Sequence, residues 1–400
     1  MSRDEQEPVL ALAVFRAVFL VSAAALLVVP ALLLHPPRSS VADGHISSAM
    51  AYASPRKIAP VPGIHFAWAG DFAEGLAPVR EGGKYGFIDT SGGMRIGPAY
   101  ACAGGFSGNR APAMMDGKWG YLDVTGRAVI PARFDYAGAF REGLAPVAVQ
   151  DSFGFIDSNG TPVGGMDYTD ARPYSEGLAA VRVGFDDYSA WGFVDKRGEM
   201  AIPPLFTDVP GGFSGGLAVV KMEGELPYRS GFIDTSGGFA IDTLYDAAGD
   251  FHEGRAPVGR GEWMGGRFRG VWGYIDTSGR LATPLAYSSA GAFREGRALV
   301  RLSGGGNAWI DPQGAVLSAF PEDLEIARPE TGDLVTYKVR ERCGFLDPSG
   351  RRITPPVFSE AGDFRQGRAR VRLVTGQADI WGYIDGNGRY LGGTVGAGSR

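Results

Sequence analysis

The stretch Trp119-Gly120-Tyr121-Leu122-Asp123-Val124-Thr125-Gly126 decides the fold, because the chain repeats its pattern nine times. In each copy an aromatic residue stands two positions before an aspartate, and a glycine stands three positions after it. Successive aspartates are 34 to 42 residues apart, a period that is typical of tandem repeat proteins. The aspartates are Asp89, Asp123, Asp157, Asp195, Asp234, Asp276, Asp311, Asp347 and Asp385.

Each copy predicts a strand that runs into a tight turn. An Asp at the first position of a type I turn accepts a hydrogen bond from the backbone two residues further on. A Gly at the fourth position adopts positive φ without steric strain, so the next strand leaves in hairpin register. Tyr121 and Leu122 are both apolar and point to opposite faces of the strand. We therefore expect neighbouring repeats to cover both faces.

Each repeat is predicted to hold three short antiparallel strands. The sequence Phe140-Arg141-Glu142-Gly143 opens a loop, and residues 144–149 form a first strand. The aspartate-bearing strand is the second, and a third follows the turn, as at residues 127–130. A proline eight residues after four of the aspartates is expected to end this third strand, because proline donates no ladder hydrogen bond. These prolines are Pro131, Pro203, Pro284 and Pro355.

The predicted fold class is all-β: a tandem array of about nine three-stranded antiparallel meanders, preceded by an apolar N-terminal helix. Either an open superhelix or a propeller-like ring would bury both faces of such sheets. Nine units exceed the usual range of about four to eight blades. The spacing is uneven, and no N-terminal strand that would complete the last unit is visible. These features favour the open superhelix, with the ring as the alternative.

The N-terminal region predicts export from the cytoplasm. Residues 17–34 contain no charged side chain and are broken only by Pro30. This run is at the lower limit for crossing a bilayer and is longer than a typical signal-peptide core. We interpret residues 1–34 as a signal sequence or a membrane anchor. Either interpretation places the rest of the chain in the cell envelope, the periplasm or the extracellular space, and an anchor would hold it at the inner membrane.

The remaining regions follow from composition. Residues 35–62 carry Pro, Ser and Ala without a period and predict a flexible linker. Residues 63–391 form the repeat domain, and the Gly-rich residues 392–400 a disordered tail. The net charge of −5 gives no electrostatic reason to expect nucleic acid. The two cysteines, Cys102 and Cys343, lie in distant repeats, and we expect two buried thiols rather than a disulfide.

No pattern in the sequence predicts catalysis, and we expect no cofactor, metal or enzymatic activity. The segment Asp89-Thr90-Ser91-Gly92 differs from an aspartic-protease motif by the extra serine, and such a protease needs two carboxylates in one site. The segment Asp157-Ser158-Asn159-Gly160 lacks the later Glu of a calcium loop. The four histidines are not at ligand spacing. The repeated aspartates are therefore interpreted as turn residues.

The segment Lys118-Trp119-Gly120-Tyr121-Leu122-Asp123, with the Phe140 loop that follows it, resembles the bacterial WG-repeat family, also called KWG repeats. Trp-Gly itself occurs at Trp119, Trp191, Trp272 and Trp381, while other residues take the Trp position elsewhere. The eighth copy also departs from the pattern, with Pro329 in place of the opening Phe. The resemblance covers roughly residues 65–391. It implies a β-rich binding or scaffold module and no catalytic residues.

Insertions of unequal length fall in one slot of the unit, between the first strand and the aspartate-bearing strand. This link is six residues from Val79 to Tyr85 and fourteen from Val258 to Trp272. In a stacked array the insertions project from one edge, which is often the binding face. Aromatic residues next to Arg are typical of binding hot spots. The candidate partner-binding residues are Asp186, Asp187, Tyr188, Tyr228, Arg229, Trp263, Arg267, Phe268 and Arg269.

We therefore expect a monomeric, non-enzymatic scaffold outside the cytoplasm that binds a protein through the insertion edge. The alternative is a module that binds a cell-envelope carbohydrate, with the loop aromatics as stacking platforms. No nucleic-acid partner is expected, and the membrane is contacted through the N-terminal segment alone. Mobile hairpin tips without a binding role are the simplest competing interpretation of the insertions.

Overall fold

The computed structural model describes residues 65–391 except 186–188, 223–228, 321–323, 329–333 and 376–377. In this part of the chain all regular structure is β-strand, and no helix is present. The predicted signal or anchor (1–34), the linker (35–62), the tail (392–400) and Pro329 lie outside the described residues. Among the residues that are described, none belongs to a helix suited to membrane crossing.

The strands form nine consecutive units, which we number 1 to 9, each with one of the repeated aspartates. Unit 1 holds β1 (Trp68–Ala69), β2 (Leu76–Glu81), β3 (Lys84–Asp89) and β4 (Met94–Tyr100); unit 2 holds β5 (Ala111–Met115), β6 (Lys118–Leu122) and β7 (Ala128–Phe134); unit 3 holds β8 (Tyr136–Ala137), β9 (Leu144–Val149), β10 (Ser152–Asp157) and β11 (Pro162–Tyr168). Unit 4 holds β12 (Asp170–Ala171), β13 (Leu178–Val183), β14 (Ala190–Asp195) and β15 (Met200–Phe206); unit 5 holds β16 (Leu217–Met222), β17 (Arg229–Asp234) and β18 (Phe239–Tyr245); unit 6 holds β19 (Ala247–Ala248), β20 (Arg255–Met264), β21 (Arg267–Asp276) and β22 (Leu281–Ala290). Unit 7 holds β23 (Ala298–Leu302), β24 (Asn307–Ile310) and β25 (Val316–Ala319); unit 8 holds β26 (Glu325–Arg328), β27 (Val335–Val339), β28 (Arg342–Leu346) and β29 (Arg352–Phe358); unit 9 holds β30 (Glu360–Arg365), β31 (Arg368–Thr375) and β32 (Ala378–Asp385).

Each unit is an antiparallel meander in which neighbours in sequence pair with one another. The prediction of three strands is incomplete, because five units add a short strand at one edge: β1, β8, β12, β19 and β26. These short strands pair with the first long strand of their unit, as Ala137 does with Val147. The sheets of units 6 and 7 are joined, because the end of β22 also pairs with β23.

The prediction that proline ends the third strand is wrong. Strand β7 continues through Pro131 to Phe134, and β15, β22 and β29 likewise contain Pro203, Pro284 and Pro355. The register against β6 shifts between Ile130 and Phe134, so the proline lies in a bulge. A bulged residue needs no ladder donor, and β7 is also the edge strand of its sheet. Proline is therefore tolerated inside the strand.

The aspartate turns match the prediction. In unit 2 the Asp123 Oδ1 atom accepts hydrogen bonds from the backbone amides of Thr125 and Arg127, at 2.9 and 3.0 Å. The backbone amide of Gly126 donates to the Asp123 carbonyl, and Gly126 has φ of 86°. The glycine has a second role that local turn chemistry does not reveal. A Cβ there would lie 2.9 Å from the Ile96 side chain of unit 1.

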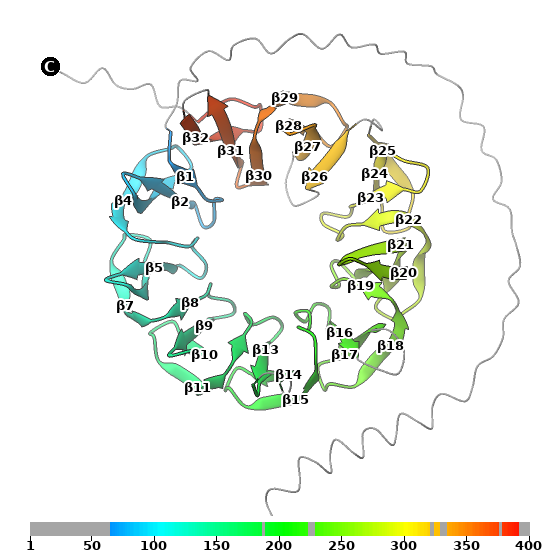
Figure 1. Cartoon of the computed structure of the whole chain (residues 1–400), viewed down its shortest axis with the longest axis horizontal. Helices are drawn as coiled ribbons and strands as arrows, with labels where there is room; N and C mark the ends of the chain where they lie inside the picture. Colours follow the sequence, from blue (N-terminus) through cyan, green and yellow to red (C-terminus); the bar gives the residue numbers. More distant parts are fainter. Residues whose placement is uncertain are drawn as a thin grey trace, which may run out of the picture. The chain divides into compact units, whose positions relative to one another are not determined.

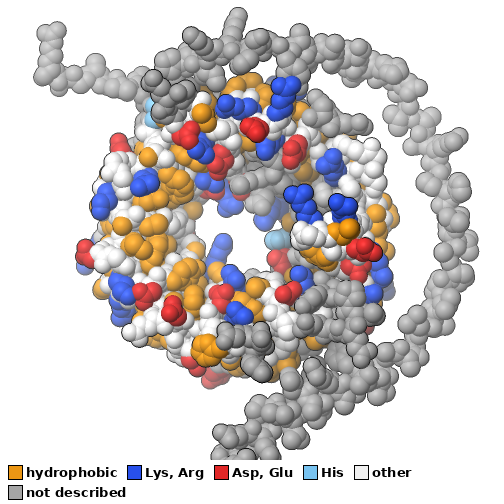
Figure 2. All heavy atoms as spheres, viewed as in Figure 1, with side chains coloured by type: hydrophobic (Ala, Val, Ile, Leu, Met, Phe, Trp, Pro, Cys, Tyr) orange, Lys and Arg blue, Asp and Glu red, His pale blue; other side chains and the backbone are white. Residues whose placement is uncertain are grey.

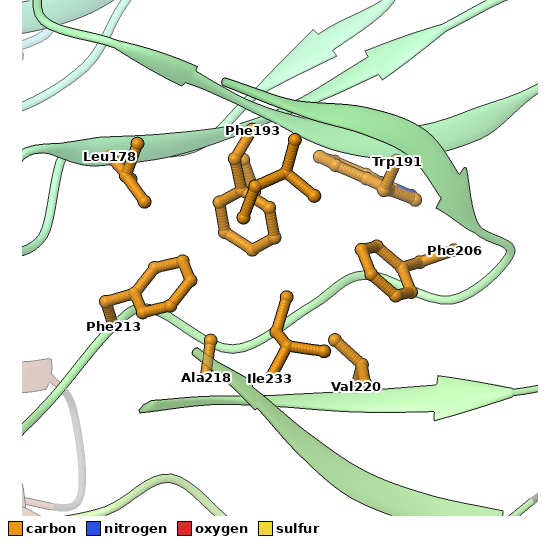
Figure 3. Packing of buried hydrophobic residues seen from close by; sticks show 10 residues of the cluster. Leu178, Trp191, Phe193, Phe206, Phe213, Ala218, Val220 and Ile233 are labelled. Carbon is orange, nitrogen blue, oxygen red and sulfur yellow. The ribbon is translucent and has the colours of Figure 1, made fainter. Parts of the chain in front are cut away.

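The core lies between successive units. The repeated aromatic of each aspartate-bearing strand is buried, as are Phe87 and the aliphatic Ile88 beside it, so both faces are covered as predicted. In units 1 to 6 the repeated aromatic packs edge-on against the opening aromatic of the next unit, as in Phe193 against Phe213 with ring centroids 5.0 Å apart. Figure 3 shows this junction, with Leu178, Trp191 and Phe206 from unit 4 facing Ala218 and Ile233 from unit 5.

The first and last units of the repeat region contact one another through β1 and β32 (Figure 1). Phe66 and Trp381 exchange two backbone hydrogen bonds of 3.0 Å. This bridge connects the two ends of the repeat region within the described residues. The Tyr383 ring packs against Phe72 at 4.9 Å, and its hydroxyl donates to the Gly70 carbonyl at 2.7 Å. Units that are adjacent in sequence are joined by the corresponding aromatic contact, such as that between Tyr121 and Phe140.

Candidate functional site

The strand register separates two edges in every unit. Leu144 lies opposite Asp157 at one end of β9–β10, and Val149 lies opposite Ser152 at the other end. The first end carries the aspartate turn and the Phe140 loop, and we call it the turn edge. The other end carries the tip of the hairpin between the first long strand and the aspartate-bearing strand, and we call it the hairpin edge. The insertion between β20 and β21, which the structure describes in full, lies on the hairpin edge.

The longest described insertion forms the hairpin of β20 and β21 in unit 6. The two strands pair from Arg255–Asp276 to Met264–Arg267, with Gly265 and Gly266 between them at positive φ. The backbone therefore makes a two-residue turn, for which glycine is suited. We call residues 260–271, the outer part of this hairpin, the tip. Trp263 and Met264 are 52% and 53% exposed, so large apolar side chains stand at its end.

A column of stacked side chains gives the tip its shape. The Trp263 and Phe268 rings lie opposite one another with centroids 5.6 Å apart, and Phe268 contacts Trp272 at 5.0 Å. The Lys221 ammonium, from β16 of unit 5, lies 5.5 Å from the Trp263 ring centroid. This distance is within the range of a cation–π interaction. The tip is therefore packed against its own base and against the preceding unit.

Asp246 attaches the tip to the body of unit 6. Its carboxylate accepts a hydrogen bond from the Gly261 amide, and its carbonyl accepts one from the Trp263 indole, both at 2.9 Å. Gly261 lies directly opposite Gly270, and a Cβ on Gly261 would lie 2.1 Å from the Arg269 carbonyl oxygen. The glycine pair thus permits a close approach of the two strands. The tip is therefore held so that Trp263 lies against Lys221 of unit 5.

The tip is basic although the chain is acidic. Arg260, Arg267 and Arg269 are exposed, and Glu262, opposite Arg269, is the one acidic residue in the tip. The net charge of the whole chain is −5. Figure 2 shows basic and hydrophobic side chains together at the place that Figure 1 labels β20 and β21. The surface has the composition of a binding hot spot, with Trp and Arg side by side.

The structure places the other predicted site residues apart from this cluster or does not describe them. Arg229 begins β17 opposite Met222, in the neighbouring unit, and is half-buried. Asp186, Asp187, Tyr188 and Tyr228 lie outside the described residues. Sequence reasoning missed Lys221 and Asp246, because their role depends on how units 5 and 6 pack. A basic residue late in the first long strand of the unit before the longest insertion was the available signal for Lys221.

The turn edge carries a second repeated arrangement, which joins the units. The Glu176 carboxylate accepts hydrogen bonds from the backbone amides of Gly215 and Gly216 in the next unit, both at 2.7 Å. The carboxylates of Glu74, Glu142 and Glu253 likewise accept hydrogen bonds from backbone amides of the next unit. At the junction of units 9 and 1, the side-chain oxygen of Gln366 accepts one from the amide of Gly75. These side chains stand in left-handed backbone, with φ near 50° at Glu176. We call this set of contacts the carboxylate ladder.

The geometry of the turn edge is that of a structural element. The hydroxyl of Thr125, donating a hydrogen bond, holds the pKa of Asp123 below its usual range. The carboxylate is thus engaged by its own turn. No group of three or more potential His, Cys, Asp or Glu metal ligands occurs among residues 65–391 where the structure describes them. Cys343 is buried, Cys102 is half-buried, and the two do not form a disulfide.

Comparison with solved structures shows a related fold. One similar structure is titled the crystal structure of the eukaryotic initiation factor, with 13% identity, a TM-score of 0.52, and coverage of 75% of this chain and 89% of that one. Prolyl oligopeptidase B from Galerina marginata is 11% identical over 64% of this chain and 50% of that one, with a TM-score of 0.41. AztD from Citrobacter koseri is 11% identical over 80% of this chain and 92% of that one, with a TM-score of 0.38. No curated protein matches the sequence.

The sequence pattern of the WG containing repeat matches at residues 64–85, 85–119, 119–151, 153–184, 191–225, 231–261, 272–305 and 344–373. These eight matches follow one another along the chain and together span more than half of it. Within them the Trp-Gly position has a physical reason, since a Cβ on Gly120 would lie 2.5 Å from the Ile130 carbonyl oxygen of the bulged third strand. The chain therefore belongs to the family of proteins built from WG containing repeats.

Proposed function

We propose that the protein is a non-enzymatic repeat scaffold that binds a protein partner through its hairpin edge, with the β20–β21 tip as the main contact. The observation that carries this proposal is the exposed Trp263–Met264 end of a hairpin that is held in place by Asp246 and Lys221. A large apolar side chain that is fixed before binding loses little conformational entropy in the complex. A mobile hairpin tip without a binding role would not need the contacts of Asp246 and Lys221 that hold Trp263 in place.

The charge of the tip points to the chemistry of the partner. Three exposed arginines surround Trp263 and Met264, so an acidic protein segment with an apolar side chain would complement the surface. Charge complementarity of this kind speeds association and fixes orientation, while the buried apolar contact supplies affinity. The rest of the hairpin edge would then serve as the rim of the contact.

The scaffold is further proposed to be a propeller-like ring in the cell envelope, and a monomer. The ring is supported by the contacts between units 9 and 1, which repeat those between units adjacent in sequence. The envelope location rests on the uncharged residues 17–34 near the N-terminus, which also suit attachment to the inner membrane. These features together describe an exported surface for protein assembly.

A carbohydrate-binding module in the cell envelope is the second candidate, and the half-exposed indole of Trp263 is the observation in its favour. Sugars stack on an open aromatic face. Lys221 lies over the Trp263 ring, and the Phe268 ring meets it at an interplanar angle of 61°. The neighbouring side chains therefore leave less of the ring for a sugar, and the protein partner is preferred.

The test is crosslinking and capture from the native host with the full-length protein. The variant combines Trp263→Ala, Phe268→Ala and Arg269→Ala, and the control combines Arg340→Ala and Glu341→Ala at the β27–β28 tip on the same edge. We expect the first variant to lose its specific protein partners and the control to keep them. Binding to peptidoglycan or purified glycans is measured in parallel. Unchanged protein partners in the first variant, with its unfolding temperature retained, would contradict the proposal, and glycan binding that depends on Trp263 would favour the second candidate.

A further inference from the structure

Three junctions between units hold an aspartate at the same place in the repeat, directly before the opening Phe of a unit: Asp71, Asp250 and Asp363. Asp363, at the junction of units 8 and 9, lies 3.5 Å from Arg365 of its own unit. At the junction of units 9 and 1 this residue is Asp71, and its carboxylate lies 2.8 Å from the Nε of Arg370. Arg370 also donates to the Ala69 carbonyl at 3.2 Å and lies 5.4 Å from the Trp381 ring centroid. The carboxylate of Asp71 therefore has a fixed cationic partner from the preceding unit.

At the junction of units 5 and 6 the same arrangement lacks its cation. Asp250 stands where Asp71 does, but Val219 takes the position of Arg370, and Ser230 that of Trp381. Asp250 is half-buried, and its Oδ1 atom and the Oγ atom of Ser230 are buried without a hydrogen-bond partner among the described protein groups. The Asp71 Oδ1 atom likewise has no well-aligned hydrogen bond, so the ion pair with Arg370 is what distinguishes Asp71 from Asp250. Removing one partner of a buried charge leaves the desolvation of the other uncompensated. Asp250 therefore occupies the position at which, at the junction of units 9 and 1, the carboxylate of Asp71 forms an ion pair.

The surroundings of Asp250 are closely packed. A Cβ on Gly211 of unit 5 would lie 1.9 Å from the Asp250 Oδ1 atom and 2.7 Å from the Val219 side chain. Burial against these groups raises the pKa of Asp250, and the charge of His252 acts in the opposite direction. On the preceding unit the charged side chains of Lys221 and Asp208 are paired with one another, with the ammonium and carboxylate 3.2 Å apart. The burial of Asp250 thus extends the range of pH over which the neutral acid is present beyond that of an exposed aspartate.

The same junction supports the tip. Val219 and Lys221 are two residues apart on β16, so their side chains point to the same face. Val219 borders the Asp250 site, and Lys221 lies under Trp263. Asp246, which holds the tip through Gly261 and Trp263, is four residues before Asp250. A displacement of β16 from residues 246–252 would therefore move the supports of the tip.

We propose that the junction of units 5 and 6 is a proton-responsive joint, in which proton uptake by Asp250 tightens the packing of β16 against residues 246–252 and fixes Lys221 and Asp246 beneath Trp263. A neutral carboxyl group can remain buried beside Val219 and Gly211, whereas the carboxylate favours opening of the junction to water. Stronger binding of an acidic partner at mildly acidic pH would follow. That consequence rests on the proposed function, but the joint itself does not.

The direction of the pH effect follows from linkage. A carboxyl group with a raised folded-state pKa binds more protons in the closed junction than in the open one, between the ordinary pKa and the raised one. Closing is therefore most favourable below the ordinary value, and this contribution is lost as the pH rises through the folded pKa. The aspartate turns have lowered pKa values and respond at lower pH in the opposite direction. The opposite signs of the two pH dependences separate the two effects.

The test is hydrogen–deuterium exchange of the full-length protein at pH 5.5 and 7.5, corrected for the intrinsic exchange rates. In the wild type we expect residues 211–221 and 246–272 to lose protection at the higher pH, by up to about tenfold per pH unit between the ordinary pKa of Asp250 and its raised folded-state pKa. Asp250→Asn keeps the group neutral and should show equal protection at both values. Val219→Arg supplies the cation found at the other junction and should likewise reduce the difference.

Two controls make the outcomes distinct. Residues 370–383, at the junction of units 9 and 1, should show no such pH effect, and His252→Gln should retain the effect at units 5 and 6. Equal protection in the wild type at both pH values, persistence of the difference in Asp250→Asn, or its loss in His252→Gln would each overturn the proposal. If the joint responds as expected while Trp263→Ala leaves partner capture unchanged, the joint stands and the proposed binding function fails.

Discussion

At the scale of single residues, the aspartate of each turn acts as a fixed acceptor for the chain that follows it. In unit 8 the Asp347 carboxylate accepts hydrogen bonds from the amides of Ser349 and Arg351 and from the Ser349 hydroxyl. Sequence reasoning identified this role, because all the atoms involved lie within four residues. Such local chemistry is visible in a single copy, and its ninefold recurrence made the interpretation secure.

The substitution Asp347→Ala tests the turn through its pH dependence. The Ser349 hydroxyl, with help from Arg351, lowers the pKa of Asp347 to about 2. A lowered pKa stabilises the fold above the ordinary value of 3.8, and this contribution is lost as the pH falls towards 2. We expect the variant to be less stable by about 1–2 kcal/mol at neutral pH, since charge-assisted hydrogen bonds are lost. Thermal unfolding between pH 2 and pH 7 measures this, and a constant difference across that range would contradict it.

The glycine of the Trp-Gly pair was recognised from the sequence without its physical reason. The third strand bulges across it, and a Cβ on Gly120 would meet the Ile130 carbonyl oxygen and the Ala132 backbone at 2.5 and 2.8 Å. The bulge itself was not predicted, because the following proline was interpreted as the end of the strand. The reason for this glycine therefore depended on a neighbouring strand that sequence pattern placed incorrectly.

The substitution Gly120→Ala is expected to destabilise the protein by about 1–3 kcal/mol, because the clashing atoms are backbone and cannot rotate away. Gly97→Ala is the matched control, since it lies in the third strand of unit 1 and a Cβ there would have no neighbour within 4 Å. Denaturant unfolding of both variants checks the difference. Equal stability of Gly120→Ala and Gly97→Ala would show that the bulge is not as close as described.

At the scale of structural elements, the β20–β21 hairpin shows what insertion length reveals and what it conceals. The fourteen-residue link from Val258 to Trp272 marked this hairpin as the longest slot, and Trp263, Phe268 and Arg269 were singled out from it. The contact with Lys221 and the tether by Asp246 were not predicted, because both depend on distances between strands. The sequence therefore indicated the residues of the tip but not the packing that holds it.

The substitution Gly261→Ala tests whether the tip is a built element. A Cβ there would lie 2.1 Å from the Arg269 carbonyl and 2.6 Å from the Gly270 Cα, so the two strands would have to separate. We expect hydrogen exchange in residues 260–271 to become about tenfold faster or more, as a local loss of about 1.4 kcal/mol implies, with little change in the global unfolding temperature. Gly304→Ala, at another hairpin tip with no neighbour within 4 Å, is the control. Unaltered exchange in residues 260–271 would argue against the Gly261–Gly270 contact.

At the scale of the whole molecule, the carboxylate ladder connects the turn edges of neighbouring units at the junctions of units 1 and 2, 3 and 4, 4 and 5, 6 and 7, and 9 and 1. Its glutamates stand in left-handed backbone, which is unfavourable for a residue with a Cβ. The hydrogen bonds to the next unit offset that strain. The Phe-x-Glu-Gly pattern was recognised in the sequence. The hydrogen-bond partner of its Glu was not, because that partner lies a full repeat away and is brought near only by the packing of the units.

The sequence could not distinguish the open superhelix from the ring either. The contacts that join Phe66 to Trp381 depend on the curvature accumulated over all nine units.

The ladder at the closing junction has a Gln in place of Glu, and this gives a test of the ring. Gln366 has one acceptor oxygen, which receives the Gly75 amide at 2.9 Å, whereas Glu176 receives two amides. If the ends meet in solution, Gln366→Glu should raise stability by about 0.5–1.5 kcal/mol, because a carboxylate replaces the amide group. Glu176→Gln should lower stability by a similar amount at a junction between units adjacent in sequence. Thermal unfolding of both variants at low salt provides the measurement. A loss in Glu176→Gln without a gain in Gln366→Glu would mean that units 9 and 1 do not hold together, and that the array is open.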